Sequence, residues 1–416
     1  MKVAVLGAGV SGLSAARILK EKGVDVTIFE KEKTVGGLAR TRFTNGYLYD
    51  PYGGHIFNSK HQVVKDWVFH ILSKDNWKFT ERNAKIFFNG KYISYPFELS
   101  LCELETNDAV ECIHDFILSQ QGKRPTNYRD WLIWNFGQAI CNYYMIPYNE
   151  KIWSYPLENM ETQWMEGKMP LPEKKDIIRS LLLKDPTERK MPHSTFYYPF
   201  HGGIQSFANA MAEGLKINVD TAVNSLENKN GKWIVNMEEE FDFIISTLPL
   251  PEVKDILKDI PQSVYRCMED LKYNSLTTVL FKCPPTDITW LYVPSHDYRS
   301  HRVGYQSALT PNASPNKNEG VGAFEIIGEQ FDVDGLDKQS NILPKELGYS
   351  QTLDYEYTKY AYVIFDSNYR KNMDVINKYF EKVDGFELLG RWGRWNYNNM
   401  DTCILDSMKL IDKLEV

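Results

Sequence analysis

The chain has 416 residues, which is long enough for two or three domains and for a core that can enclose a whole cofactor. Its 48 Lys and Arg residues against 55 Asp and Glu residues give a formal net charge of −7, which argues against nucleic acid or an anionic membrane as the main partner. No apolar run approaches the roughly 18 residues that a membrane span requires. The six cysteines have neither CxxC nor zinc-ligand spacing, so we expect a cytoplasmic protein with reduced thiols, no membrane span and no metal site.

The first thirty residues have the pattern of a strand, a helix and a second strand. Residues 2–6 form a short apolar run that ends at Gly7, and a helical pattern follows through Leu13 and Leu19. A second apolar run covers residues 24–29. This order predicts a Rossmann-type βαβ unit at the start of the chain.

Three glycines and one acid of this unit have the spacing that dinucleotide binding requires. Gly7, Gly9 and Gly12 form a GxGxxG motif directly after the first strand, and Glu30 closes the next strand. Gly7 permits a tight turn, Gly9 lets backbone N–H groups approach a pyrophosphate, and Gly12 lets the helix pack closely on the strand. Since Glu30 can accept hydrogen bonds from ribose hydroxyls, we expect this segment to bind the ADP half of FAD. The alternative is a glycine turn without a ligand.

A second glycine pair favours FAD over NAD. Gly36 and Gly37 follow the acid, and Arg40 lies four residues after Gly36. This Glu-x5-Gly-Gly-x2-Arg arrangement resembles the amine-oxidase-like flavoprotein superfamily, and the resemblance adds Gly37 and Arg40 to the expected cofactor-binding residues. The glycine pair by itself is also compatible with an ordinary surface turn.

The rest of the chain predicts two further regions. Residues 66–182 are mostly helical in pattern and rich in aromatic residues, with a hairpin-like segment around Asn89 and Gly90. Residues 272–365 have strand character, and a terminal helix begins near Met400. We expect an α/β fold with a discontinuous Rossmann-type FAD-binding domain (1–75, 190–270 and 376–416), an inserted helical domain (100–189) and a mixed β-sheet domain (76–99 and 271–375).

One loop resembles a known family of flavoenzymes. Residues 52–57, Tyr-Gly-Gly-His-Ile-Phe, are similar to the glycine-histidine loop of UDP-galactopyranose mutases, which interconvert the pyranose and furanose forms of a nucleotide sugar. In that family the loop passes under the flavin ring near its N5 atom. The resemblance implies that Gly54 and His55 contact the cofactor and that His55 takes part in catalysis. Taken alone, His55 is also compatible with a structural histidine.

A second segment resembles the nucleotide pocket of the same family. Residues 148–153 match its Tyr-Thr-Glu-Lys-x-Trp segment, and Tyr144 falls where the family stacks an aromatic ring on uracil. The resemblance implies that Tyr144, Tyr148 and Trp153 bind the nucleotide, where stacking contributes roughly 1–3 kcal/mol per base. By spacing alone, these rings also fit a helix core.

Three more residues resemble the groups with which the family holds the diphosphate: Arg302, Tyr362 and Tyr397. Arginine supplies charge and a planar fork, and phenol hydroxyls donate hydrogen bonds without adding charge. The resemblance implies that all three bind the substrate and stabilise the departing diphosphate. From local sequence, Arg302 and Tyr362 also fit a solvated surface role.

The C-terminal segment resembles the part of the family that lies along the flavin. Gly390 and Arg391 are followed by Met400 at the start of the terminal helix. The resemblance implies that these three residues contact FAD, with the helix N-terminus directed toward the flavin ring. A glycine-led turn into a terminal helix is the alternative.

The sequence departs from the family at three positions. Tyr197 stands about where the family commonly has a substrate-positioning arginine, Asn58 replaces a second histidine, and Asn399 replaces an aspartate. We still expect Tyr197 to line the substrate site. These departures leave the sugar and the nucleotide open.

The resemblance implies an FAD-dependent nucleotide-sugar mutase of polysaccharide biosynthesis, compatible with a homodimer. In such an enzyme N5 of the reduced flavin attacks the anomeric carbon, and NAD(P)H or another external reductant keeps the cofactor reduced. The alternative is an oxidase or dehydrogenase of the amine-oxidase and protoporphyrinogen-oxidase-like superfamily, which needs an apolar tunnel where the mutase has a phosphate clamp. A non-catalytic flavin-binding protein is the third reading.

Overall fold

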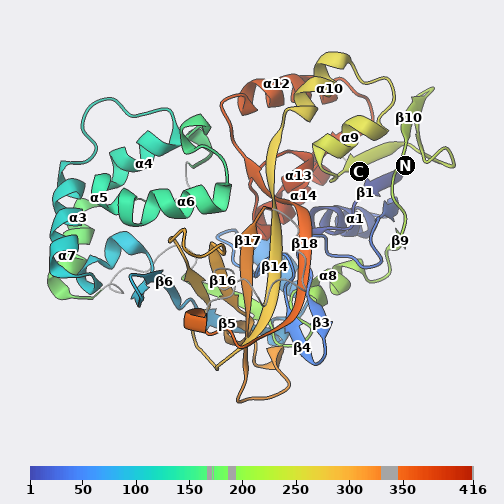
Figure 1. Cartoon of the computed structure of the whole chain (residues 1–416). Coiled ribbons are helices and arrows are strands. Elements are labelled where there is room, and N and C mark those ends of the chain that lie inside the picture. Colours follow the sequence, from blue (N-terminus) through green and yellow to red (C-terminus); the bar gives the residue numbers. More distant parts are fainter. Residues whose placement is uncertain (166–170, 172, 186–193, 329–344, 415–416) are drawn as a thin grey trace.

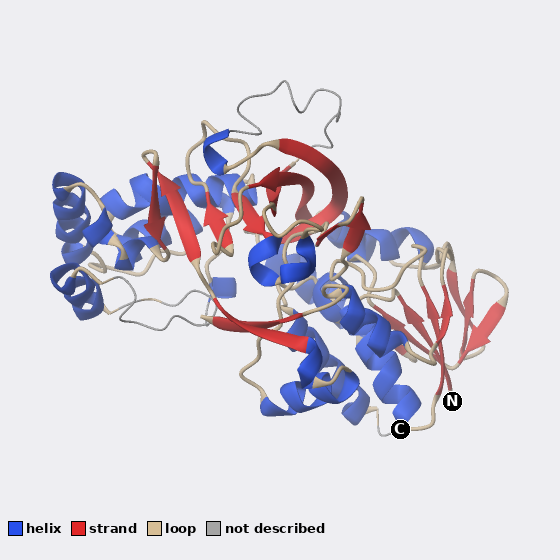
Figure 2. Cartoon of the chain, turned by 90° about the horizontal axis from the view of Figure 1, so that it is seen from below, coloured by secondary structure: helices blue, strands red, loops and turns tan. Residues whose placement is uncertain are grey.

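A computed structural model describes residues 1–165, 171, 173–185, 194–328 and 345–414 (Figure 1). Parts of the predicted helical insertion and of the predicted mixed-sheet domain lie outside the described residues. A parallel sheet lies near both chain ends, a mixed sheet occupies the centre, and a helical region lies at the opposite end from the termini (Figure 2).

The parallel sheet consists of five strands: β1 (Lys2–Leu6), β2 (Asp25–Phe29), β9 (Lys216–Asn218), β13 (Phe243–Ser246) and β19 (Phe386–Leu388). Their order is β19-β13-β1-β2-β9, and each neighbouring pair is parallel. Helix α1 (Val10–Glu21) connects β1 to β2, as the sequence predicted. Because the strands come from segments far apart in the chain, the sheet is discontinuous.

The terminal helix α14 (Met400–Lys413) packs along α1 and begins at the predicted Met400. The Ser14 hydroxyl donates a hydrogen bond to the Ser407 hydroxyl at 2.8 Å between the two buried helix faces. This packing holds the C-terminal segment beside the glycine-rich start of α1.

The central mixed sheet consists of seven strands: β6 (Ala84–Phe88), β7 (Lys91–Ser94), β14 (Lys272–Cys283), β15 (Trp290–Tyr292), β16 (Arg302–Tyr305), β17 (Gly320–Ile327) and β18 (Gln351–Ile364). Their order is β18-β14-β17-β16-β15-β6-β7. The predicted hairpin joins β6 to β7, and Asn89 and Gly90 at its tip both have positive φ, as a two-residue hairpin turn requires. The antiparallel register of β16 and β17 places Arg302 opposite Glu325.

The helical region consists of α3 (Thr106–Leu118), α4 (Tyr128–Phe136), α5 (Gln138–Ile140), α6 (Ile146–Trp153) and α7 (Lys174–Leu183). A π-helical turn, Cys141–Met145, joins α5 to α6. Helix α6 extends from this region toward the central sheet (Figure 1). The α/β fold class predicted from the sequence is confirmed.

One strand differs from the predicted domain boundaries. Strand β5 (Trp77–Glu81) pairs with β8 (Thr195–Pro199) in a separate two-stranded sheet, although residues 76–99 were expected in the mixed sheet. The physical reason is its buried face, where the Trp77 ring lies 5.6 Å from Phe207 of α8 (Gln205–Ala212).

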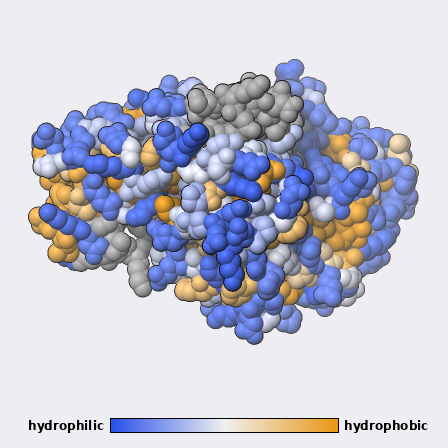
Figure 3. All heavy atoms as spheres, turned by 60° about the horizontal axis from the view of Figure 1, so that its bottom comes forward, coloured by the Kyte–Doolittle hydropathy of each residue, from blue (hydrophilic) through white to orange (hydrophobic). Residues whose placement is uncertain are grey.

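Apart from short 3-10 turns, the remaining described elements are α2 (Gln62–Ile71), α9 (Leu250–Ile256), α10 (Gln262–Glu269), α11 (Gln306–Leu309), α12 (Tyr369–Phe380), α13 (Gly390–Gly393), β3 (Arg42–Thr44), β4 (Tyr47–Tyr49), β10 (Leu226–Lys229), β11 (Lys232–Val235) and β12 (Glu239–Phe241). Hydrophilic side chains cover much of the face shown in Figure 3, and hydrophobic ones gather at its left end, over the helical region, and in a second group toward its right side. No helix within the described ranges has both the length and the apolar character to cross a membrane.

Candidate active site

Two of the motif glycines are required by the chain itself. Gly7 ends β1 with a φ of +94°, and its N–H donates to the Phe29 carbonyl at 2.8 Å. A Cβ at Gly12 would overlap the carbonyl oxygen of Gly7. Glycine at these two positions therefore allows α1 to start directly against β1.

Gly9 has a different reason to be glycine. Its φ is −75°, which any residue adopts, and a Cβ there would meet only the Cα of Gly37 at 3.8 Å. Neither backbone strain nor packing within the chain excludes a side chain at this position. The space lies at the N-terminus of α1, where free N–H groups and the helix dipole favour a pyrophosphate. This open cradle fits the diphosphate of FAD.

Glu30 and Arg40 flank the cradle. The Glu30 carboxylate is buried at the end of β2 and accepts hydrogen bonds from the N–H groups of Ala8 (2.7 Å) and Glu32 (2.9 Å). The Nε of Arg40 is enclosed and has no hydrogen-bond partner among the described residues. An enclosed donor without an acceptor costs about 1–3 kcal/mol, and a bound anion would remove that cost. A Cβ at Gly37, which has a φ of +59°, would lie 2.9 Å from the backbone of Gly9, so this second glycine lets the two loops meet.

The C-terminal segment lies against the same helix start. Gly390 has a φ of +82°, and a Cβ there would overlap the hydroxyl of Ser11 in the first turn of α1. Nε and Nη2 of Arg391 donate to the Asn398 carbonyl at 2.9 and 2.7 Å, and its guanidinium lies 4.8 Å from the Tyr397 ring centroid. The structure thus places Gly390 and Arg391 between the glycine cradle and the tyrosine predicted to bind the substrate.

The glycine-histidine loop is held by a buried acid. The Asp50 carboxylate accepts hydrogen bonds from the His55 N–H (3.1 Å) and the Tyr198 hydroxyl (2.8 Å), and burial raises the pKa of Asp50 to about 7. The Nδ1 of His55 lies 2.6 Å from the Gly53 carbonyl oxygen. Burial and the nearby Arg391 cation lower the pKa of His55 to about 4, so the imidazole is neutral at pH 7.

The structure gathers five predicted nucleotide and diphosphate residues into one group of rings, called here the aromatic cluster: Tyr144, Tyr148, Trp153, Tyr362 and Tyr397. Tyr144 stacks on Tyr148 with centroids 5.4 Å apart, and Tyr362 stacks on Tyr397 at 5.9 Å. The Trp153 ring lies 6.3 Å from Tyr362 and 6.4 Å from Tyr397. Segments separated by up to 253 positions thus meet at one place.

Arg302 lies beside this cluster and is bound by Glu325. Nε and Nη2 of Arg302 donate to the two carboxylate oxygens of Glu325 at 2.9 and 2.6 Å, and the Glu325 side chain is only 1% exposed. Burial alone would lower the pKa of Arg302, but Glu325, together with the nearby Tyr362 and Tyr148, outweighs this effect, and the pKa is raised. A Cβ at Gly53 would lie 3.2 Å from this carboxylate, so the ion pair lies against the glycine-histidine loop. The buried His301 ring, 6.2 Å from Tyr148, connects the pair to the aromatic cluster.

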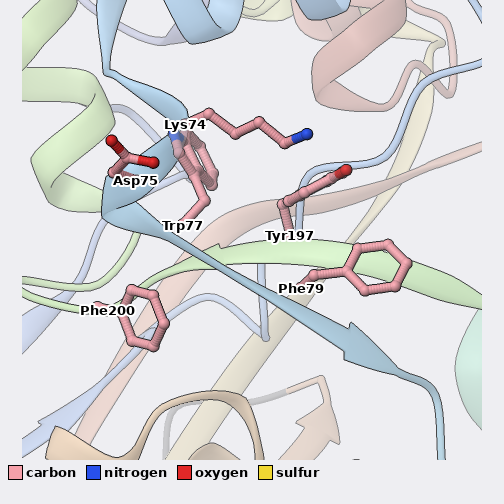
Figure 4. A pocket seen from close by; sticks show the side chains of 6 residues that line it. All are labelled: Lys74, Asp75, Trp77, Phe79, Tyr197 and Phe200. Carbon is pink, nitrogen blue, oxygen red and sulfur yellow. The ribbon is translucent and has the colours of Figure 1, made fainter.

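The backbone of Tyr197 pairs with Phe57 at the end of the glycine-histidine loop, but its ring lies apart from the aromatic cluster. Its ring lies 5.2 Å from that of Phe79, on the same face of the β5–β8 pair as Trp77, and lines a shallow pocket with Lys74, Trp77 and Phe200 (Figure 4). Side chains alternate along a strand, so the neighbours of Tyr197 in β8 point inward while Tyr197 points outward. Within the described ranges, its ring contacts do not include the aromatic cluster.

Three residues of this region were not predicted from the sequence: Asp50, Glu325 and Arg82, whose guanidinium lies 5.0 Å from the Trp290 ring centroid next to the glycine-histidine loop. Glu325 had a visible signal, because it is the only charged residue in the apolar strand β17, and a buried acid requires a partner. Asp50 and Arg82 carry no comparable local pattern.

Comparisons with known proteins agree with this geometry. Family models for an NAD(P)-binding Rossmann-like domain and for a flavin containing amine oxidoreductase match residues 5–71 and 131–332. A UDP-galactopyranose mutase of Mycoplasma pneumoniae is 28% identical over 167 residues, which is 38% of this chain and 41% of that protein. Protoporphyrinogen oxidase 2, chloroplastic/mitochondrial, of Arabidopsis thaliana is 22% identical over 460 aligned residues, covering 94% of this chain and 89% of that protein.

A crystal structure of reduced UDP-galactopyranose mutase matches with a TM-score of 0.87 at 22% identity, covering 99% of this chain and 95% of that chain. The two family models and the shared fold are those of the amine-oxidase-like class of flavoproteins, to which this chain is similar. Within this class, the chain shares the fold of UDP-galactopyranose mutase, and the resemblance predicted from the sequence is confirmed at the level of fold.

Proposed function

We propose that the protein is an FAD-dependent nucleotide-sugar mutase that interconverts pyranose and furanose forms of a sugar linked to a nucleoside diphosphate. The observation that carries this proposal is the polar character of the region beside the glycine-histidine loop. Arg302 lies against the loop, and Tyr362 and Tyr397 stack nearby. Charge and phenol hydroxyls suit a diphosphate, whereas an enzyme that oxidises an apolar substrate needs an apolar channel there.

The residues that would hold FAD are the glycine loop from Gly7 to Gly12, Glu30, Arg40 and the segment around Arg391. When bound and reduced, FAD would supply a nucleophilic N5 atom for the anomeric carbon. Because the reaction has no net redox change, NAD(P)H or another external reductant would need to reduce the flavin only once, before the first turnover. His55 adds no charge beside the ring, because it stays neutral at pH 7.

The chain's own residues would stabilise the leaving group. Departure of the diphosphate develops negative charge, which fixed donors and cations stabilise without reorganising. Arg302 keeps its charge beside Glu325, and its Nη1, which makes no hydrogen bond with a described residue, can bind an oxygen of the leaving group. Burial raises the pKa of Tyr362, so its hydroxyl keeps its proton and can donate a hydrogen bond.

An FAD-dependent oxidase or dehydrogenase is the second candidate. The similarity to protoporphyrinogen oxidase, at 22% identity, extends over 94% of the chain and supports it. Such an enzyme transfers electrons from its substrate to an acceptor in every turnover, whereas a mutase has no net redox change.

Product analysis separates the two candidates. The yellow holoprotein is incubated with UDP-galactose, UDP-N-acetylgalactosamine and other nucleotide sugars, either oxidised or reduced by dithionite, and the mixtures are chromatographed. The proposal predicts a furanose product only after reduction. Peroxide formation with an oxidisable amine or porphyrinogen, and no furanose under either condition, would support the second candidate.

We also propose that two copies associate through the helical region. Helices α3 and α7 pack together and expose apolar side chains, among them Val110, Leu118, Leu182 and Leu183. Exposed apolar patches of this kind favour association. Sedimentation velocity of the wild type and of Leu182→Glu tests the proposal, with a dimer expected only for the wild type.

A further inference from the structure

Arg82 lies between β5 and β6 and has no carboxylate partner in the part of the chain that the structure describes. Its guanidinium lies 5.2 Å from the Tyr95 ring centroid and 5.0 Å from that of Trp290. Nη2 donates to the Tyr292 hydroxyl, Nε is enclosed without a hydrogen-bond partner, and Nη1 makes no hydrogen bond with a described residue. Two rings therefore hold a full positive charge whose donors are largely unused.

The rings around Arg82 connect it to both parts of the proposed site. A Cβ at Gly54 would lie 3.5 Å from the indole of Trp290, so one side chain separates Arg82 from the glycine-histidine loop. The Tyr292 ring, which Arg82 contacts, lies 5.4 Å from Tyr148 of the aromatic cluster. Arg82 thus stands where the predicted flavin loop and the predicted nucleotide residues approach each other.

The charges of the arginines in this region are not equivalent. Arg302 is paired with Glu325, so it offers N–H donors to a ligand, but the pair as a whole adds no net positive charge to the site. Arg391 donates to a backbone carbonyl and belongs to the predicted flavin site. Burial raises the pKa of Tyr95, and the positive charges of Arg82 and Arg302 partly counteract this rise. Both cations therefore lie near the Tyr95 ring. A nucleotide sugar brings a diphosphate with more than one negative charge, and among these three arginines Arg82 is the cation that has neither a carboxylate nor a backbone carbonyl partner for its guanidinium within the described ranges.

We propose that Arg82 binds an anionic group of the substrate, either the diphosphate or a carboxylate on the sugar ring, and this inference rests on the proposed mutase function. The rings of Tyr95 and Trp290 hold the Arg82 guanidinium in place, so less side-chain entropy is lost when an anion binds. A residue that only fills the space between the two rings would not need a charge.

The test measures binding of UDP, UDP-galactose and UDP-galacturonic acid to the full-length holoprotein by calorimetry. Loss of a charge-assisted contact in Arg82→Gln is expected to weaken binding by about tenfold or more. If the diphosphate is the bound group, all three ligands weaken alike. If a sugar carboxylate is the bound group, only UDP-galacturonic acid weakens. Arg82→Lys is expected to recover part of the affinity, and Arg266→Gln on the exposed face of α10 is the matched control.

The flavin absorbance of each variant shows whether it has folded. Arg82→Met keeps an unbranched stem between the rings and replaces Arg82→Gln if the latter loses its flavin. Wild-type affinity of either variant for all three ligands would overturn the inference. Failure of the wild-type holoprotein to bind any of the three would instead overturn the proposed function.

Discussion

The glycine-rich start of α1 and the aromatic cluster are two binding regions built in opposite ways. The first is contained in residues 2–40, where β1, α1 and β2 fix the spacing of glycines and acid. The second joins residues 144 to 397, which only tertiary packing brings together. The glycine-rich region depends on positions without a Cβ atom, and the aromatic cluster depends on contacts between side chains.

This difference decides how each region is disrupted. In the glycine loop one methyl group is enough, because the ligand or the chain occupies the space of the missing Cβ. Near the aromatic cluster the sensitive features are charges and hydrogen bonds, above all the pair of Arg302 and Glu325. Four substitutions test the contrast, taken from the largest expected effect on stability to the smallest.

Gly12→Ala is expected to have the largest effect. The new Cβ would overlap the Gly7 carbonyl oxygen, which belongs to the backbone and cannot rotate away. We expect a loss of more than about 3 kcal/mol in the free energy of unfolding, at or above the upper end for overpacked sites. Urea titration measures it, and a midpoint equal to that of the wild type would contradict the account.

Glu325→Ala is expected to cost about 3 kcal/mol, the lower end for a broken buried ion pair, because it leaves the Arg302 cation, whose side chain is 20% exposed, without its buried partner. The double variant Glu325→Ala/Arg302→Ala should lose less free energy of unfolding than the two single variants lose together, since no unpaired charge remains. Glu269→Ala on the exposed surface of α10 is the control. Additive effects of the two substitutions would show that the ion pair does not couple them.

Asp50→Asn is expected to change the pH dependence of stability. The pKa of Asp50 is raised by burial from 3.8 to about 7, so the folded state binds this proton more tightly than the unfolded state. Stability from this group is therefore complete below about pH 4 and is lost as pH rises to 7, with a slope of up to about 1.4 kcal/mol per pH unit. Thermal melts from pH 4 to 8 should show a shallower decline for Asp50→Asn. Parallel profiles would remove Asp50 as the titrating group.

Gly9→Ala is expected to have the smallest effect on stability and a decisive one on cofactor binding. Its Cβ meets only Gly37 at 3.8 Å, so the apoprotein should lose less than about 1 kcal/mol. The same methyl group occupies the cradle at the start of α1 and should abolish the flavin absorbance. A yellow Gly9→Ala protein would show that the open space does not serve FAD.

The same contrast explains what the sequence could predict. The unit of β1, α1 and β2 and the start of α14 follow from local patterns and are found as predicted. Arg302, Tyr362 and Tyr397 were selected by resemblance, and the structure brings them together. Glu325 lies 23 positions from Arg302 and faces it only through the register of β16 and β17. No local sequence pattern reveals the register of β16 and β17. The Tyr197 ring lies apart from the aromatic cluster, because side chains alternate between the two faces of β8.

The central claim is a reaction on a reduced flavin without net redox change, and counting turnovers tests it most directly. The holoprotein is reduced anaerobically with one equivalent of dithionite per flavin and then given excess UDP-galactose without an electron acceptor. We expect many furanose products per flavin while the flavin spectrum stays reduced. One product or fewer per flavin, formed as the flavin changes its oxidation state, would contradict the claim.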